Sequence, residues 1–311
     1  MTTVQGTPHD QAIRKARLTK RVTSILVYLA LFAFSFTILF PFYWVVRTAL
    51  TDPALLFGNI RSLVPTDATG VNFLRVMGLF DPQILIEEGA TNVSPGRLNF
   101  LLFIRNSLIV GITITVGQVF FSATAAYAFA RLKFPGRDTL FALYVAGLMI
   151  PAIVLFIPNY VLVRELGWIN TFAGIIAPSL LMTPFAVFFM RQFFLSLNTS
   201  IEEAAILDGA TKVGYFTRIA LPLVQGPALT LGVLTFILNW NQYLWPFVVG
   251  RAEEVRMLTV ALSIFRSQTP QGAPDWTGLM AAAALSIIPS VLLFIFLGRR
   301  VVDSIQFSGF K

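Results

Sequence analysis

Six long apolar stretches, none of which contains a charged residue, constrain the fold of this chain more than any other feature of its sequence. Each is long enough to cross a bilayer as a helix, which takes roughly 20 apolar residues. They are Ile25–Val46, Ser107–Ala130, Leu140–Val163, Thr171–Met190, Ala228–Val249 and Gly278–Leu297. Because a helix satisfies its own backbone hydrogen bonds in hydrocarbon, we predict an all-α polytopic membrane protein with six transmembrane helices.

The composition agrees with a membrane protein and excludes several kinds of site. Hydrophobic residues make up 56% of the chain and charged residues 12%, with a mean hydropathy of +0.75. Typical globular domains carry about twice that share of charge. The sequence has no cysteine, so a disulfide, a thiolate nucleophile and a Cys-ligated metal are excluded. Its single histidine, His9, lies in the polar N-terminal tail.

The uncharged spans also bear on how such a protein could act. A stand-alone secondary transporter usually places ionisable residues within the membrane to couple ions, and these spans have none. A membrane-embedded enzyme would need convergent histidine, cysteine or carboxylate groups, which the spans also lack. The residue content therefore disfavours both classes.

Basic residues gather on one side of the predicted topology. If the N-terminus is inside, most of the 23 Lys and Arg residues fall in cytoplasmic segments, in agreement with the positive-inside rule. We therefore predict two cytoplasmic termini, and the net charge of +8 needs no nucleic-acid partner. The predicted organisation is a basic tail (1–22), a six-helix transmembrane domain (23–300) with an extracytoplasmic loop (51–99) and a cytoplasmic loop (196–223), and a tail (301–311).

The cytoplasmic loop between the fourth and fifth spans has the signals of two short helices. Ser200 and Glu203 have the spacing of a capping box, which predicts a helix start. Gly209 predicts the end of that helix, because glycine accepts left-handed backbone angles at little cost. A second helix is expected to stop near Pro222, since proline disfavours helical angles at the preceding residue.

The spacing within this loop resembles the EAA signature of ABC importer permeases. The matching positions are Glu203, Ala204, Ala205, Gly209, Ile219, Leu221 and Pro222. A generic amphipathic loop helix is the alternative interpretation, but it does not account for so many residue types at fixed spacing. In that family the segment is a coupling helix that docks into the ATP-hydrolysing subunit, so the resemblance implies that these residues lie at that contact.

The chain lacks a nucleotide-binding motif, and the resemblance implies partner subunits that supply one. The sequence has no G-x-x-x-x-G-K-[ST] phosphate-binding loop, so we expect no enzyme activity and no bound cofactor in this chain. ATP and Mg²⁺ would bind the partner ATPase subunits. The implied partners are a homologous second permease, an ABC ATPase dimer, an extracytoplasmic solute-binding protein and the lipid of the bacterial inner membrane.

A second motif lies in the fifth span and is similar to the W-N-x-[FY]-L-W-P stretch of carbohydrate-type, maltose-like permeases. Candidate substrate-pathway residues there are Asn239, Trp240, Asn241, Gln242, Tyr243 and Trp245. Asn239 and Gln242 would share one helical face, and aromatic and amide groups together suit a sugar. The alternative is hydrogen bonding between helices together with an interfacial aromatic belt. Gln242 departs from the family, where an acid is common.

The resemblance implies a solute class but not a particular solute. A sugar or oligosaccharide delivered by a binding protein is expected, with glycerol-3-phosphate or another polyol-type solute as the alternative. The segment Arg251–Thr277 is a plausible docking surface for that binding protein. Within it, Met257–Phe265 is apolar but too short to span, which predicts an interfacial or re-entrant helix.

Overall fold

The computed structural model describes residues 8–58, 61–90, 93–94, 99–264 and 274–306. All regular secondary structure in these ranges is helical. Three helices are long and apolar enough to cross a membrane, and the number rises to six if each of three bent helix pairs is one span. The long helices are α1 (Pro8–Ala49), α4 (Phe100–Arg131) and α15 (Trp276–Gln306). The predicted all-α membrane fold is therefore confirmed, whereas the count of six spans depends on how the bent pairs are counted.

The predicted third span is not one straight helix. It comprises α5 (Arg137–Ala146), η1 (Gly147–Met149), η2 (Ala152–Leu155) and α6 (Phe156–Glu165). The two halves meet at 91°. Pro151 explains the break, because it has no N–H to donate and holds Ile150 in an extended conformation (ψ 114°).

The predicted fourth span is also broken, at an angle of 44° between α7 (Phe172–Leu180) and α8 (Pro184–Ser196). Pro184 occupies the first turn of α8, and Thr183 before it is extended (ψ 154°). The Thr183 hydroxyl accepts a hydrogen bond from the backbone N–H of Ala186, so the new helix is capped within the span.

The fifth predicted span, Ala228–Val249, is wrong as a single helix. It is divided into α12 (Gln225–Trp240) and α13 (Leu244–Val249). Pro246 gives a physical reason, because a proline fits the first turn of a helix but cannot donate within a continuous one. The third bent pair instead joins residues 212–223 to α12 at 75°.

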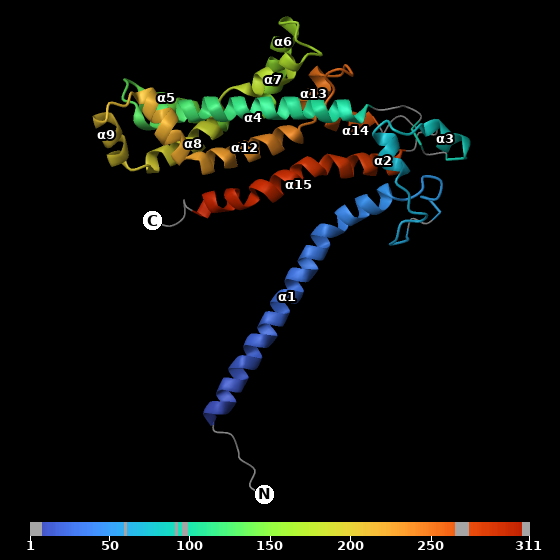
Figure 1. Cartoon of the computed structure of the whole chain (residues 1–311). Helices are drawn as coiled ribbons and strands as arrows, with labels where there is room; N and C mark the ends of the chain where they lie inside the picture. Colours follow the sequence, from blue (N-terminus) through green and yellow to red (C-terminus); the bar gives the residue numbers. More distant parts are fainter. Residues whose placement is uncertain (1–7, 59–60, 91–92, 95–98, 265–273, 307–311) are drawn as a thin grey trace.

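α4 is the central helix of the fold (Figure 1). It contacts α8, α7 and α12, and α15 lies against α12. Small buried residues such as Ala123 and Ala126 allow close approach of the neighbouring helices near one end. At the other end, Phe100 and Phe103 are fully buried with Trp240 from α12. These contacts place the two ends of α4 in separate apolar cores.

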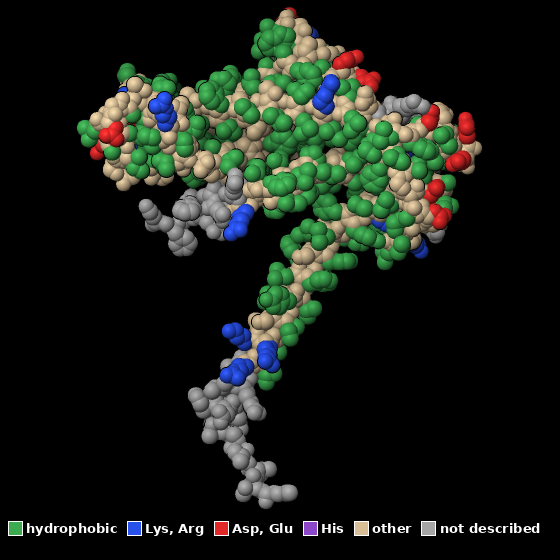
Figure 2. Space-filling model, in the orientation of Figure 1, with side chains coloured by type: hydrophobic (Ala, Val, Ile, Leu, Met, Phe, Trp, Pro, Cys, Tyr) green, Lys and Arg blue, Asp and Glu red, His purple; other side chains and the backbone are tan. Residues whose placement is uncertain are grey.

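α1 differs from the other long helices because most of it has no neighbour within the chain. It contacts α15 and then diverges from the bundle (Figure 1). Every residue from Arg17 to Tyr43 is exposed, and apolar side chains make up most of this surface up to a basic tip (Figure 2). Such a surface requires lipid or another apolar partner.

The predicted extracytoplasmic segments contain three short helices, α2 (Val71–Val76), α3 (Pro82–Glu87) and α14 (Leu258–Ile264). α14 corresponds to the short helix predicted at Met257–Phe265, although Phe265 lies outside the described residues. Leu258 and Ala261 of α14 are buried, and the helix contacts α4 and α15. It is therefore part of the bundle core.

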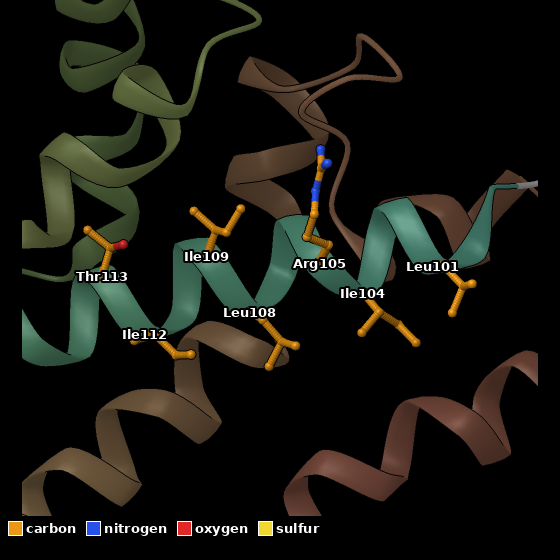
Figure 3. A pocket seen from close by; sticks show the side chains of 7 residues that line it. All are labelled: Leu101, Ile104, Arg105, Leu108, Ile109, Ile112 and Thr113. Carbon is orange, nitrogen blue, oxygen red and sulfur yellow. The ribbon is translucent and has the colours of Figure 1, made fainter.

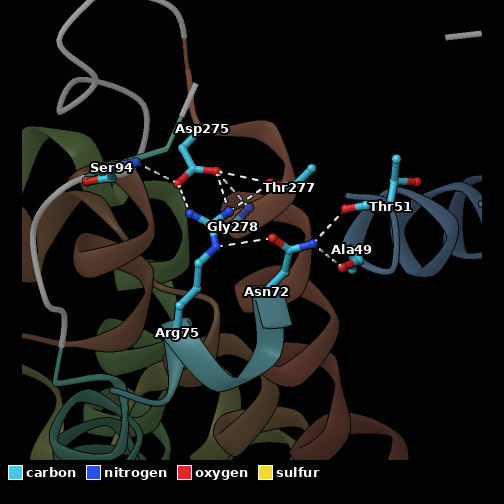
Figure 4. A network of polar contacts seen from close by, with 8 residues as sticks. All are labelled: Ala49, Thr51, Asn72, Arg75, Ser94, Asp275, Thr277 and Gly278. Atoms are coloured by element: carbon cyan, nitrogen blue, oxygen red, sulfur yellow. Dashed lines mark hydrogen bonds and ion pairs between the residues drawn. The ribbon is translucent and has the colours of Figure 1, made fainter. Parts of the chain in front are cut away.

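A buried polar network holds α2 to the ends of α1 and α15 (Figure 4). The Arg75 guanidinium forms two hydrogen bonds with the Asp275 carboxylate, and its Nε donates to Asn72 Oδ1 at 3.1 Å. The Asn72 amide in turn donates to the carbonyl oxygens of Ala49 and Thr51, each at 2.8 Å. Three segments that are distant in sequence are thereby joined.

Candidate functional site

The predicted cytoplasmic loop forms two short helices joined by a turn. α9 runs from Thr199 to Leu207, and its N-cap is Asn198, whose side chain accepts a hydrogen bond from the Ser200 N–H at 3.0 Å. The helix therefore starts slightly earlier than the predicted capping box at Ser200, because Asn198 takes the capping role. The predicted helix itself is present.

Gly209 ends α9 as the sequence predicts. Its φ is +84°, in the left-handed region that glycine adopts without a steric penalty. The Gly209 N–H donates to the Ile206 carbonyl at 3.0 Å, and the Ala210 N–H donates to the Ala205 carbonyl at 2.9 Å. These two bonds form a Schellman motif, which fixes the direction of the chain after α9.

The second helix of the loop contains a π-helical turn. α10 (Lys212–Tyr215) continues through this turn at Phe216–Ala220 into α11 (Leu221–Leu223). The helix ends at Leu223, next to the stop that the sequence predicts near Pro222. The wide π turn allows Pro222 to lie within the last turn, because it relieves the clash that a proline ring makes with the preceding turn.

Arg131, the last residue of α4, ties this loop to the membrane helices. Its Nε and Nη2 donate to the Phe194 carbonyl at 2.9 and 2.6 Å, and Nη2 also donates to the Leu197 carbonyl. Its Nη1 lies 3.4 Å from the Glu202 carboxylate on α9. One side chain therefore satisfies the carbonyl end of α8 and holds α9, a role that the sequence pattern did not indicate.

Aromatic packing beneath the loop adds to this attachment. The Tyr127 ring of α4 lies 5.7 Å from Phe194, 6.3 Å from Tyr215 and 4.9 Å from Phe216, measured between centroids. Tyr215 is fully buried. The loop thus rests on an apolar base that extends into α4 and α8.

The tryptophans of the fifth-span motif are buried within the chain. Trp240 stacks on Phe236 at 5.6 Å, and its indole N–H donates to the Ser286 carbonyl of α15 at 3.1 Å. The Trp245 indole N–H donates to the Gly174 carbonyl of α7 at 3.2 Å. Both rings therefore make the contacts between helices that were the alternative interpretation of this motif.

The amides of the motif do not share one helical face, which corrects the expectation for Asn239 and Gln242. Asn239 and Asn241 each donate to a carbonyl one turn earlier in α12, at 2.8 Å. Because α12 ends at Trp240, Gln242 lies in the turn that follows. Tyr243 is exposed and stacks on Phe247 at 5.2 Å between centroids.

A protein-family profile described as binding-protein-dependent transport system inner membrane component matches residues 118–306. This match includes the two-helix loop and the broken fifth span. The chain belongs to this family. It is a multi-pass plasma-membrane permease subunit of an ABC importer, and subunits of this kind are not themselves ATPases.

Several similar proteins are named as permeases of transport systems. The chain is 34% identical to the arabinooligosaccharides transport system permease protein AraQ of Halalkalibacterium halodurans, over 75% of its own length and 82% of the length of AraQ. The chain is 33% identical to the sn-glycerol-3-phosphate transport system permease protein UgpE of Salmonella typhi, over 85% of its own length and 89% of the length of UgpE. Identity to the probable ABC transporter permease protein YurM of Bacillus subtilis is 29%, over 97% and 94% of the chains.

A solved structure has the same fold as the permease. It is a chain of a bacterial ABC transporter involved in the import of the acidic polysaccharide alginate, with a TM-score of 0.75 and 22% identity. The likeness covers 90% of the permease and 97% of that chain. The arrangement of helices is therefore that of an importer permease.

The predicted coupling residues differ in exposure. Glu203, Ala204, Gly209 and Pro222 are exposed, whereas Ala205 is buried against the base of the loop. Ile219 and Leu221 are half-buried and pack on the same apolar cluster. The structure thus divides the signature into an outward-facing set and a set that holds the loop in place.

Three apolar side chains on the outward face were not singled out by the sequence motif. Leu207 is 87% exposed, Val213 is 72% exposed and Ile206 is 51% exposed. They lie on either side of the Gly209 turn, close to exposed polar residues such as Asp208 and Lys212. Exposed apolar side chains grouped in this way are typical of a protein interface.

A shallow groove runs along the outer surface of α4 and contains Arg105 (Figure 3). Its remaining lining is almost entirely apolar, including Leu108 and Ile112. The groove belongs to one helix and offers few polar groups. It therefore lacks the convergent polar side chains of a solute site.

Proposed function

We propose that this permease imports a sugar or oligosaccharide that an extracytoplasmic binding protein delivers. Relatives named for arabinooligosaccharides and a structural neighbour that imports alginate support a carbohydrate. Relatives named for sn-glycerol-3-phosphate support that solute, or another polyol, as the second candidate. ATP and Mg²⁺ bind the partner ATPase dimer, and a homologous second permease completes the membrane part.

The observation that carries the ATP-driven part of this proposal is the exposed loop on its rigid base. Glu203 and Ala204 face outward, together with Leu207 and Val213, while Arg131 and the aromatic base hold the loop to α4 and α8. A partner that grips this surface moves the loop and both helices as one body. The motion of an ATPase dimer as it closes is thereby transmitted to the membrane helices.

The proposed orientation places this loop and both termini in the cytoplasm. The basic residues Arg17, Lys20 and Arg21 at the start of α1 then lie inside, as the positive-inside rule requires. The short helices α2, α3 and α14 lie outside in this orientation. The segment Arg251–Thr277 is the proposed docking surface for the binding protein.

Among the fifth-span residues, the proposed solute contacts are those that the chain leaves accessible. Asn241 and Tyr243 are exposed and Gln242 is half-buried. Asn239 is half-buried and bonded to its own helix. Trp240 and Trp245 act by holding α12 and α13 to their neighbours, and their contribution to the pathway is to position the exposed residues.

Charge reversal at the loop tests the coupling role. We expect Glu203→Lys to abolish most ATP-driven uptake in reconstituted vesicles, because it changes an exposed charge at the ATPase contact. The matched control is Glu165→Lys, an exposed charge reversal at the predicted extracytoplasmic end of α6, which should leave uptake nearly unchanged. Normal uptake and normal ATPase co-purification with Glu203→Lys would count against the coupling surface.

Isolation of the native assembly tests the partners and the solute class. The tagged permease, purified in mild detergent, should bring down an ATPase with a phosphate-binding loop and a second permease in near-equal amounts. Vesicles containing that assembly and its binding protein should then take up a neutral oligosaccharide. Isolation of the chain alone in a transport-competent form would support a secondary transporter instead.

A further inference from the structure

Two helix breaks from different predicted spans meet in the structure. The Tyr144 hydroxyl of α5 donates to the Met182 carbonyl in the break between α7 and α8, at 2.9 Å. A methyl group added to Gly147, at the first break, would lie 3.3 Å from the ring of Pro184, at the second. Each break falls near the centre of its apolar stretch, so the meeting point lies within the predicted membrane-spanning region.

Several backbone carbonyl groups at this point accept no hydrogen bond from any described residue. They belong to Leu148, Met149 and Ile150 in the first break and to Leu181 in the second. The neighbouring Leu180 carbonyl instead packs against Gly117 of α4, and Gln118 donates to Ser179 at 3.3 Å. The breaks therefore present a group of free hydrogen-bond acceptors.

The side chains of the two breaks are open to the outside of the chain. Met149 is 84% exposed and Leu181 is 56% exposed, with Ile150 and Met182 at 51% and 44%. Non-helical backbone at membrane depth persists only where protein buries it or where it lines a water-filled cavity, because an unsatisfied carbonyl in hydrocarbon costs several kcal/mol. Apolar packing from a partner would not supply the missing donors, whereas water or hydroxyl groups would.

We propose that the paired breaks, residues 147–152 and 180–184, line the solute pathway and bind a neutral, hydroxyl-rich solute through their free carbonyl oxygens. The proposal rests on the proposed function and names the solute class for it. Sugar hydroxyl groups donate to the carbonyl oxygens, and exposed apolar side chains such as Met149 cover the C–H faces of the sugar. The pathway therefore includes a contact region in this chain outside the fifth-span motif.

The same chemistry distinguishes the two solute classes. Carbonyl oxygens carry partial negative charge, and the two predicted spans that contain the breaks have no Lys or Arg residue. A phosphate or carboxylate here would face acceptors alone, without a compensating cation. We therefore expect neutral sugars to be favoured over glycerol-3-phosphate.

The absence of native cysteine makes a labelling test direct. Met149→Cys and Met182→Cys are made singly in the full assembly in vesicles and exposed to a membrane-impermeant charged thiol reagent. Two controls are Phe32→Cys, exposed on the apolar face of α1, and Met190→Cys, which is fully buried. Because the parent chain has no thiol, every label found on this chain, once it is separated from its partner subunits, comes from the introduced residue.

The expected result is labelling of positions 149 and 182 and none at positions 32 and 190. A transported neutral oligosaccharide, supplied with its binding protein, should slow labelling at both break positions several-fold. Glycerol-3-phosphate at the same concentration should not.

One outcome would overturn this inference while leaving the proposed function intact. It is ATP-driven sugar uptake with positions 149 and 182 unlabelled in every state, which would mean that a partner chain covers the breaks. Uptake and protection by glycerol-3-phosphate but not by neutral sugars would overturn both this inference and the proposed carbohydrate, in favour of the second candidate solute. Loss of all ATP-driven uptake in the parent assembly would instead contradict the proposed function itself.

Discussion

Arg75 and Asp275 form a buried two-point ion pair although they are 200 residues apart in the sequence. Nη1 and Nη2 of the arginine lie 2.5 and 2.7 Å from the two carboxylate oxygens. The carboxylate also accepts from the backbone N–H groups of Ser94 and Gly278, each at 2.9 Å. The pair therefore joins α2 to the residue that precedes α15, with no unsatisfied charge.

Removal of one partner of this pair should destabilise the permease. Asp275→Ala leaves the buried Arg75 cation uncompensated, which costs about 3–5 kcal/mol. We expect the melting temperature in detergent to fall clearly, and tryptophan fluorescence measures this change. Glu88→Gln, an exposed change in the same region, should have little effect.

The double variant Arg75→Met with Asp275→Leu provides the sharper comparison. It removes both charges together and should be more stable than Asp275→Ala alone. Equal melting temperatures for the parent and Asp275→Ala would contradict the assigned importance of the ion pair.

Arg131→Lys should weaken coupling without removing the charge. Lysine lacks the planar fork that lets Arg131 donate to the carbonyls of Phe194 and Leu197 at once. We expect several-fold less uptake per ATP hydrolysed in vesicles. The control is Arg137→Lys, whose bonded partners Leu132 and Asp138 lie at the end of α4 and in the first turn of α5, outside the two-helix loop. An unchanged ratio in Arg131→Lys would show that the fork is not needed.

Gly209→Ala should strain the turn after α9 in the proposed ATPase-contacting loop. The residue has φ +84° and no heavy atom within 4 Å of the added methyl, so the cost is backbone strain of about 1–2 kcal/mol. Gly136→Ala is a matched control with φ +76° and equally open space. Both should lower the melting temperature similarly, but only Gly209→Ala should weaken binding of the ATPase. Equal effects on ATPase binding would contradict the assignment.

Gly117→Ala should disturb the packing of α4 against α7. The added methyl would lie 2.5 Å from Leu180 Cδ1 and 2.8 Å from the Leu180 carbonyl oxygen, so the helices must move apart. We expect a loss of about 1–3 kcal/mol, seen as a lower melting temperature. Gly232→Ala has 3.7 Å of space and should be neutral or slightly stabilising, since alanine favours helix. A stable Gly117→Ala variant would show that the contact is loose.

The sequence by itself determined that this protein folds in a membrane and that its loop contains a helix ending at Gly209. Long uncharged apolar stretches can be satisfied only by a bilayer or by similar helices, so the all-α membrane fold follows from composition and length. The end of α9 at Gly209 also followed from local chemistry, because a left-handed backbone position selects glycine wherever it occurs.

Only the tertiary structure decided which helices break and which side chains are accessible. Pro41 and Pro289 remain inside continuous helices, whereas the chain breaks at Pro151 and Pro184. A proline leaves backbone groups unpaired in every case, so a break persists where neighbouring helices bind those groups. At one of these breaks the Tyr144 hydroxyl donates to the Met182 carbonyl. Burial of the fifth-span tryptophans and the reach of Arg131 likewise depend on long-range neighbours, which local sequence does not specify.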